Sequence, residues 1–165
     1  MTLRAAKILL LAAVALFYTF VVFNNVTDYN SNYQFVHHVL LMDTTFPGNH
    51  GMWRAIHPNA LQIISYDGII AWEVFTTTLA WIGVVCLARA LRKPAAIFNR
   101  TKRTGVIALT AAMLLWFVAF ISVGGEWFLM WQSKIWNGQE AAFRMFASIG
   151  IVFLLLAMPD HEEQP

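Results

Sequence analysis

The chain has 165 residues, and its 11 Lys and Arg and 9 Asp and Glu give a net charge of only +2 at pH 7. Hydrophobic residues make up 59% of the chain and charged residues 12%, whereas about a quarter of an ordinary soluble domain is charged. This composition excludes an ordinary soluble domain and fits a chain whose outer surface faces lipid. The small net charge also argues against nucleic-acid binding.

Four apolar segments organise the chain, and each is long enough, or nearly so, to cross a bilayer core about 30 Å thick as a helix. They cover residues 5–23, 61–88, 105–130 and 141–158. The basic start of the first segment resembles a signal peptide, but its small-residue string AVA lies in mid-run, which favours an uncleaved signal anchor. We therefore predict one integral membrane domain over residues 1–165. Its fold class is all-α, a transmembrane four-helix bundle with an ordered extracytoplasmic loop between the first two helices.

The distribution of Lys and Arg predicts the orientation of these helices. Eight of the 11 lie at the N-terminus or in the connection between the second and third spans, and three lie on the other side of the membrane. Because cytoplasmic connections carry an excess of basic residues, we expect both chain termini and the basic connection in the cytoplasm. Contact with anionic lipid is an alternative role for the basic connection, but orientation alone explains it.

Charged residues at the outer ends of the spans are the main polar candidates. Counting the helical rise from the cytoplasmic ends places Glu73 about 6 Å and Arg144 about 7 Å inside the apolar slab. Since an unpaired charge is costly there, we predict that these two side chains face each other across the bundle. Asp67 and Glu126 are predicted nearby, in the same buried polar cluster. Glu140, one turn before Arg144, is the rival partner for the guanidinium.

Small and polar residues recur at helical spacing on the second and third spans. Stripes of this kind pack against other membrane helices, so the first stripe turns Glu73 toward the bundle interior. The second stripe, with steps of four and three residues, predicts a left-handed packing seam that continues to Glu126. The two stripes are Glu73, Thr76, Thr77, Ala80 and Gly83, and Ala108, Ala112, Leu115, Ala119, Ser122 and Glu126.

The connection between the first two spans, residues 24–59, is too apolar for a disordered linker. Its string YQFVHHVLLM predicts a short helix that ends at Asp43. Asp43 and four histidines of this connection are candidate metal ligands. The histidines lack the i, i+4 spacing of a helical metal motif, so hydrogen-bonding or interfacial roles are favoured. These histidines are His37, His38, His50 and His57.

Cofactors and aromatic residues give two further expectations. No histidine lies in any predicted span, so haem inside the bundle is disfavoured and no cofactor is predicted. Tryptophan is enriched where a membrane meets water, so we expect an aromatic belt near the outer boundary. Exposed tryptophans of such a belt can also anchor a protein partner. The tryptophans concerned are Trp53, Trp127, Trp131 and Trp136.

The chain contains four distinctive strings: FNNVTDYNSN, MDTTFPGN, WRAI and GGEWFLMWQSKIWNGQEAAFR. They resemble those of a bacterial family of predicted small four-helix integral membrane proteins of unknown function. The resemblance covers most of the chain, from the first span to about Pro159. It implies four helices in a bacterial inner membrane, and it implies no activity and no catalytic residue.

The residues by themselves name no activity. The chain contains no nucleotide-binding loop, nucleophile elbow or kinase motif, which favours a non-enzymatic protein. The first hypothesis is an accessory or assembly subunit of a larger membrane complex, in contact with lipid and with a partner protein or further copies of itself. The alternatives are a small transporter or channel that uses the outer-half carboxylates, and a metal-handling or enzymatic protein at the outer face.

Overall fold

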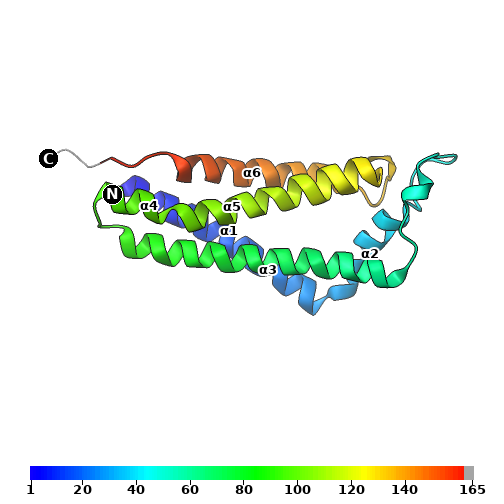
Figure 1. The fold of residues 1–165 in the computed structure, drawn as a ribbon, viewed down its shortest axis with the longest axis horizontal. Coiled ribbons are helices and arrows are strands. Elements are labelled where there is room, and N and C mark those ends of the chain that lie inside the picture. The colour runs from blue at the N-terminus through cyan, green and yellow to red at the C-terminus, as the bar shows by residue number, and fades with distance from the viewer. Residues whose placement is uncertain (162–165) are drawn as a thin grey trace.

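Four long helical segments run side by side in the computed structural model, which describes residues 1–161 (Figure 1). Each overlaps one predicted span and is long and apolar enough to cross a membrane. The fold is therefore all-α, as predicted, and the described residues contain no strand. The segments are α1 (Thr2–Thr27), α3 (Asn59–Ala90), α5 with η2 (Arg103–Leu114 and Leu115–Trp127), and α6 (Gln139–Ala157).

Short helices complete the two ends of the bundle. The loop end carries α2 (Tyr29–Leu41), η1 (Met52–Arg54) and η3 (Met130–Gln132), and the basic end carries α4 (Ala95–Thr101) and both ends of the described chain (Figure 1). The predicted helix in the string YQFVHHVLLM is confirmed as part of α2. This helix stops at Met42, whose φ of 55° leaves the helical region.

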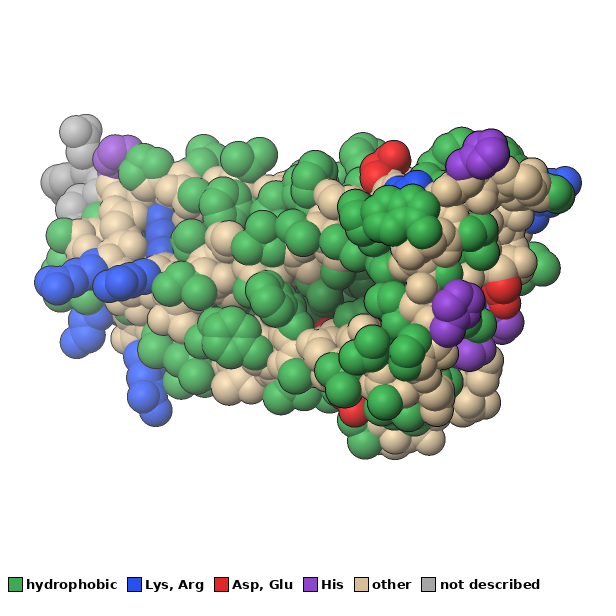
Figure 2. All heavy atoms as spheres, turned by 45° about the vertical axis from the view of Figure 1, so that its right-hand side comes forward, with side chains coloured by type: hydrophobic (Ala, Val, Ile, Leu, Met, Phe, Trp, Pro, Cys, Tyr) green, Lys and Arg blue, Asp and Glu red, His purple; other side chains and the backbone are tan. Residues whose placement is uncertain are grey.

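The flanks of the long helices are apolar on the outside. Lys and Arg side chains gather at the basic end, and hydrophobic side chains cover the long middle part (Figure 2). Each long segment exposes large apolar side chains, for example Leu9, Ile64, Phe117 and Leu154. A bilayer covers such faces without cost, and the helices satisfy their own backbone hydrogen bonds, as a membrane-spanning chain must.

Small residues let the helices approach closely in the middle of the bundle. Ala15, Ala80 and Ala108 are buried against each other from α1, α3 and α5. Gly83 of α3 faces Gly105 of α5, where a Cβ added at Gly83 would lie 3.0 Å from the Gly105 backbone. This is the small-residue packing by which membrane helices associate, and it confirms the inward face predicted for the second span.

We expect Gly83→Ala to destabilise the fold by about 1–3 kcal/mol, because its methyl group meets backbone that cannot yield. Gly68 lies on the same helix, and a Cβ there would meet no atom within 4 Å. The matched change Gly68→Ala should therefore leave stability unchanged or raise it slightly, since Ala favours helix over Gly. Thermal unfolding in detergent, followed by tryptophan fluorescence, compares the two variants. Equal unfolding midpoints would refute the close α3–α5 contact.

The third spanning segment changes its winding halfway along. α5 is an α-helix, whereas η2 is a π-helix, in which backbone bonds reach five residues back and each turn holds more residues. The hydroxyl of Ser122 likewise donates to the carbonyl of Phe117 at 2.9 Å. The predicted seam therefore loses its register within η2. Ala108 and Leu115 are buried as predicted, but Glu126 is exposed.

Candidate functional site

Glu73 is a buried ionisable residue of α3, in the half of this helix that lies nearer the loop end. It lies on the face of α3 that also buries Tyr66, Thr76 and Ala80, and its residue exposure is 3%. The inward orientation predicted for Glu73 is therefore confirmed. Its hydrogen-bond partner is Asn25 of α1, whose Nδ2 donates to Oε2 of Glu73 at 2.6 Å.

The predicted pairing of Glu73 with Arg144 is wrong. The guanidinium of Arg144 is exposed and lies 3.4 Å from the carboxylate of Glu140, the rival partner one turn earlier. The reason lies in the rotation of α6, which buries Ala142 and Ile149. Arg144 follows Ala142 by two positions, about 200° around the helix, so it points away from the bundle interior.

Asp67 and Glu126 also lie apart from Glu73, so the predicted four-residue cluster does not form. Both side chains are exposed. Six residues separate Asp67 from Glu73, which places them on different faces of α3. Asp67 instead accepts a hydrogen bond from Tyr29 at 2.8 Å. Desolvation and this carboxylate raise the pKa of Tyr29 to about 12, so the phenol remains a donor at neutral pH.

Asn25 is the centre of the network that does form around Glu73. Besides donating to Glu73, it accepts hydrogen bonds at Oδ1 from Asn32 at 2.8 Å and from Tyr66 at 3.1 Å. These side chains come from α1, α2 and α3, so the network ties three helices together. Asn25 was not predicted from the sequence, although the paired asparagines at the end of the first span were an available signal.

Glu73 opens on a cavity. This cavity has a volume of about 380 Å³, and Asn25, Asn32 and Trp116 also line it. A second, apolar cavity of about 420 Å³ adjoins it between α2, α3 and η2. A hollow between hydrophobic side chains is visible on one flank of the bundle in Figure 2. The residues that line both cavities are Phe35, Val36, Ile69 and Phe120.

Two buried polar atoms in this region have no hydrogen-bond partner among the described residues. They are Nε1 of Trp116 and Oγ1 of Thr76. Trp116 lines the cavity with Glu73, and Thr76 follows Glu73 by three positions on the same face of α3. A buried polar group without a partner costs about 1–3 kcal/mol. The cavity thus combines the carboxyl group of Glu73 with apolar and aromatic walls, which is the composition of a small-molecule site.

The candidate metal ligands are dispersed. Nδ1 of His37 lies 2.6 Å from Oε1 of Gln62, and Nδ1 of His38 lies 2.6 Å from a carboxylate oxygen of Asp43. The ring of His38 also stacks on Trp136. Within residues 1–161, no three His, Cys, Asp or Glu side chains come close enough to hold a metal ion. Two histidines therefore take hydrogen-bonding roles, and His50 and His57 join no such group.

Three of the predicted interface tryptophans are exposed at the loop end. Trp53 and Trp127 meet edge to face with ring centroids 5.8 Å apart, and the guanidinium of Arg54 lies over both rings. Trp131 is also exposed, whereas Trp136 is half-buried beneath His38.

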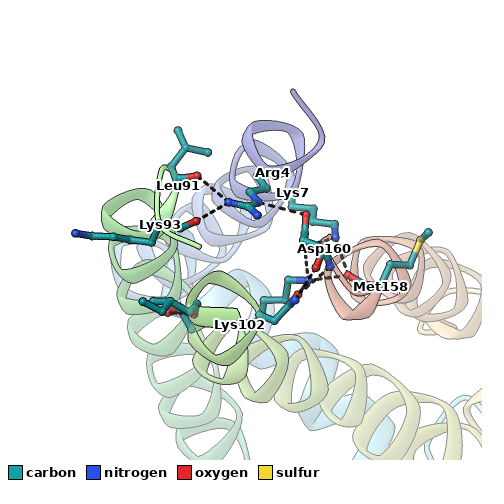
Figure 3. Close-up of polar contacts among 10 residues, drawn as sticks. Arg4, Lys7, Leu91, Lys93, Lys102, Met158 and Asp160 are labelled. Carbon is teal, nitrogen blue, oxygen red and sulfur yellow. Dashed lines mark hydrogen bonds and ion pairs between the residues drawn. The ribbon is translucent and has the colours of Figure 1, made fainter. Parts of the chain in front are cut away.

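A second polar cluster closes the basic end (Figure 3). Oδ2 of Asp160 pairs with Nζ of Lys7 at 2.7 Å and with Nζ of Lys102, and Nε of Arg4 lies 3.8 Å from Oδ1. Both lysines also donate to the carbonyl of Met158, at 2.7 and 2.6 Å. All four charged side chains are at least nine-tenths buried. The cluster therefore joins the start of α1 and the start of α5 to the chain that follows α6.

Charge, more than burial, decides the protonation of Asp160. Burial by itself would raise the pKa of this carboxyl, but the ammonium groups of Lys102 and Lys7 hold it below its ordinary value. This cluster was not predicted from the sequence, because Lys7 and Lys102 served there only to predict the orientation of the helices. An aspartate directly after Pro159, at the end of the last span, was the available clue.

Four spanning helices with lipid-facing flanks define the class of this molecule, a small integral membrane protein. The chain belongs to the DUF2165 family, described as predicted small integral membrane proteins, whose family model matches residues 3–159. This result confirms the predicted resemblance to a family of small integral membrane proteins. No curated protein and no solved structure matches the chain.

Proposed function

We propose that this protein binds an amphiphilic small molecule from the bilayer in the two adjoining cavities at its loop end. The head group would be a hydroxyl, which can donate to the carboxyl group of Glu73. The apolar part would lie in the 420 Å³ cavity. The observation that carries the proposal is the buried carboxyl group of Glu73 on the wall of a cavity that shares four apolar residues with a second, apolar cavity.

The shape of the site supports a lipophilic ligand over an ion. The apolar cavity is walled by side chains of Phe35, Ile69 and Phe120, and these three also wall the cavity of Glu73. The alternative function, transport along a path lined by Asp67, Glu73 and Glu126, is not supported. Asp67 and Glu126 are exposed and do not lie beside Glu73. Binding of a lipophilic molecule from the bilayer therefore explains the two adjoining cavities better than ion transport does.

Photolabelling with 3-azioctanol, a short alcohol that carries a photoreactive group, tests the proposal on the purified protein. We expect mass spectrometry to find the adducts on residues that line the two cavities. Ile69→Trp should fill the shared wall and lower this labelling several-fold. Ile64→Trp on the same helix is the matched control, because Ile64 is exposed to lipid and lines neither cavity.

Two outcomes contradict the proposal. One is labelling spread evenly over the lipid-facing helices, and the other is equal cavity labelling of the Ile69→Trp and Ile64→Trp proteins. A thermal unfolding midpoint for each variant shows that the comparison is made between folded proteins. Glu73→Gln keeps the shape of the side chain and replaces its carboxyl group by an amide. A loss of labelling in this variant, smaller than the loss in Ile69→Trp, assigns the head-group contact to the carboxyl group.

The finer predictions from the sequence remain proposals. We propose a bacterial inner membrane and cytoplasmic chain termini, and the gathering of basic side chains at the end that holds both ends of the described chain supports this orientation. An accessory or assembly role in a larger membrane complex is compatible with ligand binding. The exposed pair Trp53 and Trp127 with Arg54 supports it, because such residues anchor protein partners.

A further inference from the structure

We propose that the basic end of this protein holds a second binding site, which takes a phosphate group. The site is a cavity of about 610 Å³ beside the Asp160 cluster. Arg4 and Arg92 line it together with Asp160, and Leu3 and Pro159 add apolar wall. Guanidinium groups recognise phosphate through paired, charge-assisted hydrogen bonds.

Among residues 1–161, the positive charges of the Asp160 cluster outnumber the negative ones. Arg4, Lys7 and Lys102 bring three positive charges around the carboxylate of Asp160, and all four side chains are at least nine-tenths buried. A buried excess of two positive charges is costly unless an anion lies close to it. The carboxylate does not repel that anion strongly, because both lysines already engage it.

Two hydrogen bonds and a ring contact hold the guanidinium of Arg4 at this cavity. Its Nη1 donates to the carbonyls of Lys93 at 2.8 Å and Leu91 at 3.4 Å, and its guanidinium lies over the ring of Phe98 at 5.0 Å. These contacts hold the guanidinium in place and leave Nη2 without a bond among the described residues. Arg92 is exposed on the same cavity, whereas the side chain of Lys93 extends away from the cluster (Figure 3).

The start of α1 lies at the same cavity, because Leu3 and Arg4 of its first turn line the wall. No side chain caps this helix, and its first backbone N–H groups together with the helix dipole favour an anion. Leu3 in the first turn is 52% exposed and lines the cavity. An acyl chain can lie against Leu3 while the phosphate meets Arg4, so a lipid head group and free phosphate are the two sources to distinguish.

The test compares two charge reversals in nanodiscs of phosphatidylcholine with and without phosphatidylglycerol. Arg92→Glu alters the cavity, and Arg89→Glu makes the same change one turn earlier on α3, at an exposed residue outside the cavity. Native mass spectrometry counts the retained lipid. We expect the wild-type chain and Arg89→Glu to retain phosphatidylglycerol, and Arg92→Glu to retain about ten-fold less, the equivalent of one charge-assisted contact.

A second arm adds inorganic phosphate to phosphatidylcholine nanodiscs and follows the unfolding midpoint. A rise with phosphatidylglycerol assigns the site to lipid, and a rise with inorganic phosphate alone assigns it to the free anion. Both results support the site if Arg92→Glu abolishes them and Arg89→Glu does not. Equal behaviour of the two reversals, or no rise with either anion, overturns the proposal.

The acidic tail supplies one more control. Glu162 and Glu163 follow His161 in the sequence and lie outside the described residues. Deleting residues 162–165 should leave phosphatidylglycerol retention at the wild-type level. If retention appears only after this deletion, the tail carboxylates supply the counter-charge and the proposed site is overturned.

Discussion

Asp160→Asn should lower the free energy of unfolding by about 3–5 kcal/mol, the largest loss that we expect from a single substitution. The substitution leaves the buried cations Lys7, Lys102 and Arg4 facing one another without a carboxylate. It also removes the ion pairs that join the chain after α6 to the starts of α1 and α5, whereas the hydrogen bonds of both lysines to the Met158 carbonyl remain. Thermal unfolding in detergent measures the loss. Glu126→Gln is the control, because it removes an exposed acid from the opposite end of the bundle.

The same cluster predicts a pH dependence. The pKa of Asp160 is lowered in the folded protein, so its stabilisation is complete above the ordinary aspartate pKa of about 3.9 and is lost as the pH falls through the lower folded value. The gap between the unfolding midpoints of the wild type and Asp160→Asn should therefore be constant from pH 7 to about pH 5 and shrink below pH 4. A gap that widens in acid contradicts the ion pairs.

Asn25→Ala should lower the free energy of unfolding by about 2–4 kcal/mol. It removes the hydrogen bond to Glu73 and leaves Tyr66 and Asn32 without their common acceptor. A hydrogen bond contributes about 0.5–1.5 kcal/mol, and each buried group that loses its partner adds about 1–3 kcal/mol to the loss. Asn24→Ala is the matched control, since Asn24 is the adjacent residue of the same type and is exposed.

A second variant separates the charge of Glu73 from its hydrogen bond. Asn25→Ala combined with Glu73→Gln should recover part of the stability lost in the single variant, because a neutral amide without a partner is less costly to bury than a carboxylate. Additive losses in this pair of changes would show that Asn25 and Glu73 do not interact.

The candidate site was only half predictable from the sequence. Burial of Glu73 followed from the small residues spaced along its helix face. Its partner did not follow, because depth in the membrane leaves the rotation of each helix undetermined. Arg144 lies at a suitable depth but on the wrong face of α6. Asn25, at the end of α1 and 48 residues before Glu73, provides the contact instead.

The π-helical winding of η2 also prevented a correct prediction of the Glu126 orientation from the sequence. The seam from Ala108 to Glu126 assumes α-helical turns throughout, and local sequence gives no sign that the backbone bonds change to five residues back. That change turns Glu126 outward. The segment also contributes Trp116 and Phe120 to the cavity walls.

The sequence by itself determined that the chain is all-α with four spanning helices, because the thickness of the hydrocarbon core fixes the length of the apolar runs. It also determined the inward face of α3, because helical periodicity places small residues on one side. Only the tertiary structure decided which polar groups meet. The contact of Lys7 with Asp160 joins residues 153 positions apart, and such contacts depend on how each helix is rotated and where its chain ends lie, which no local pattern encodes.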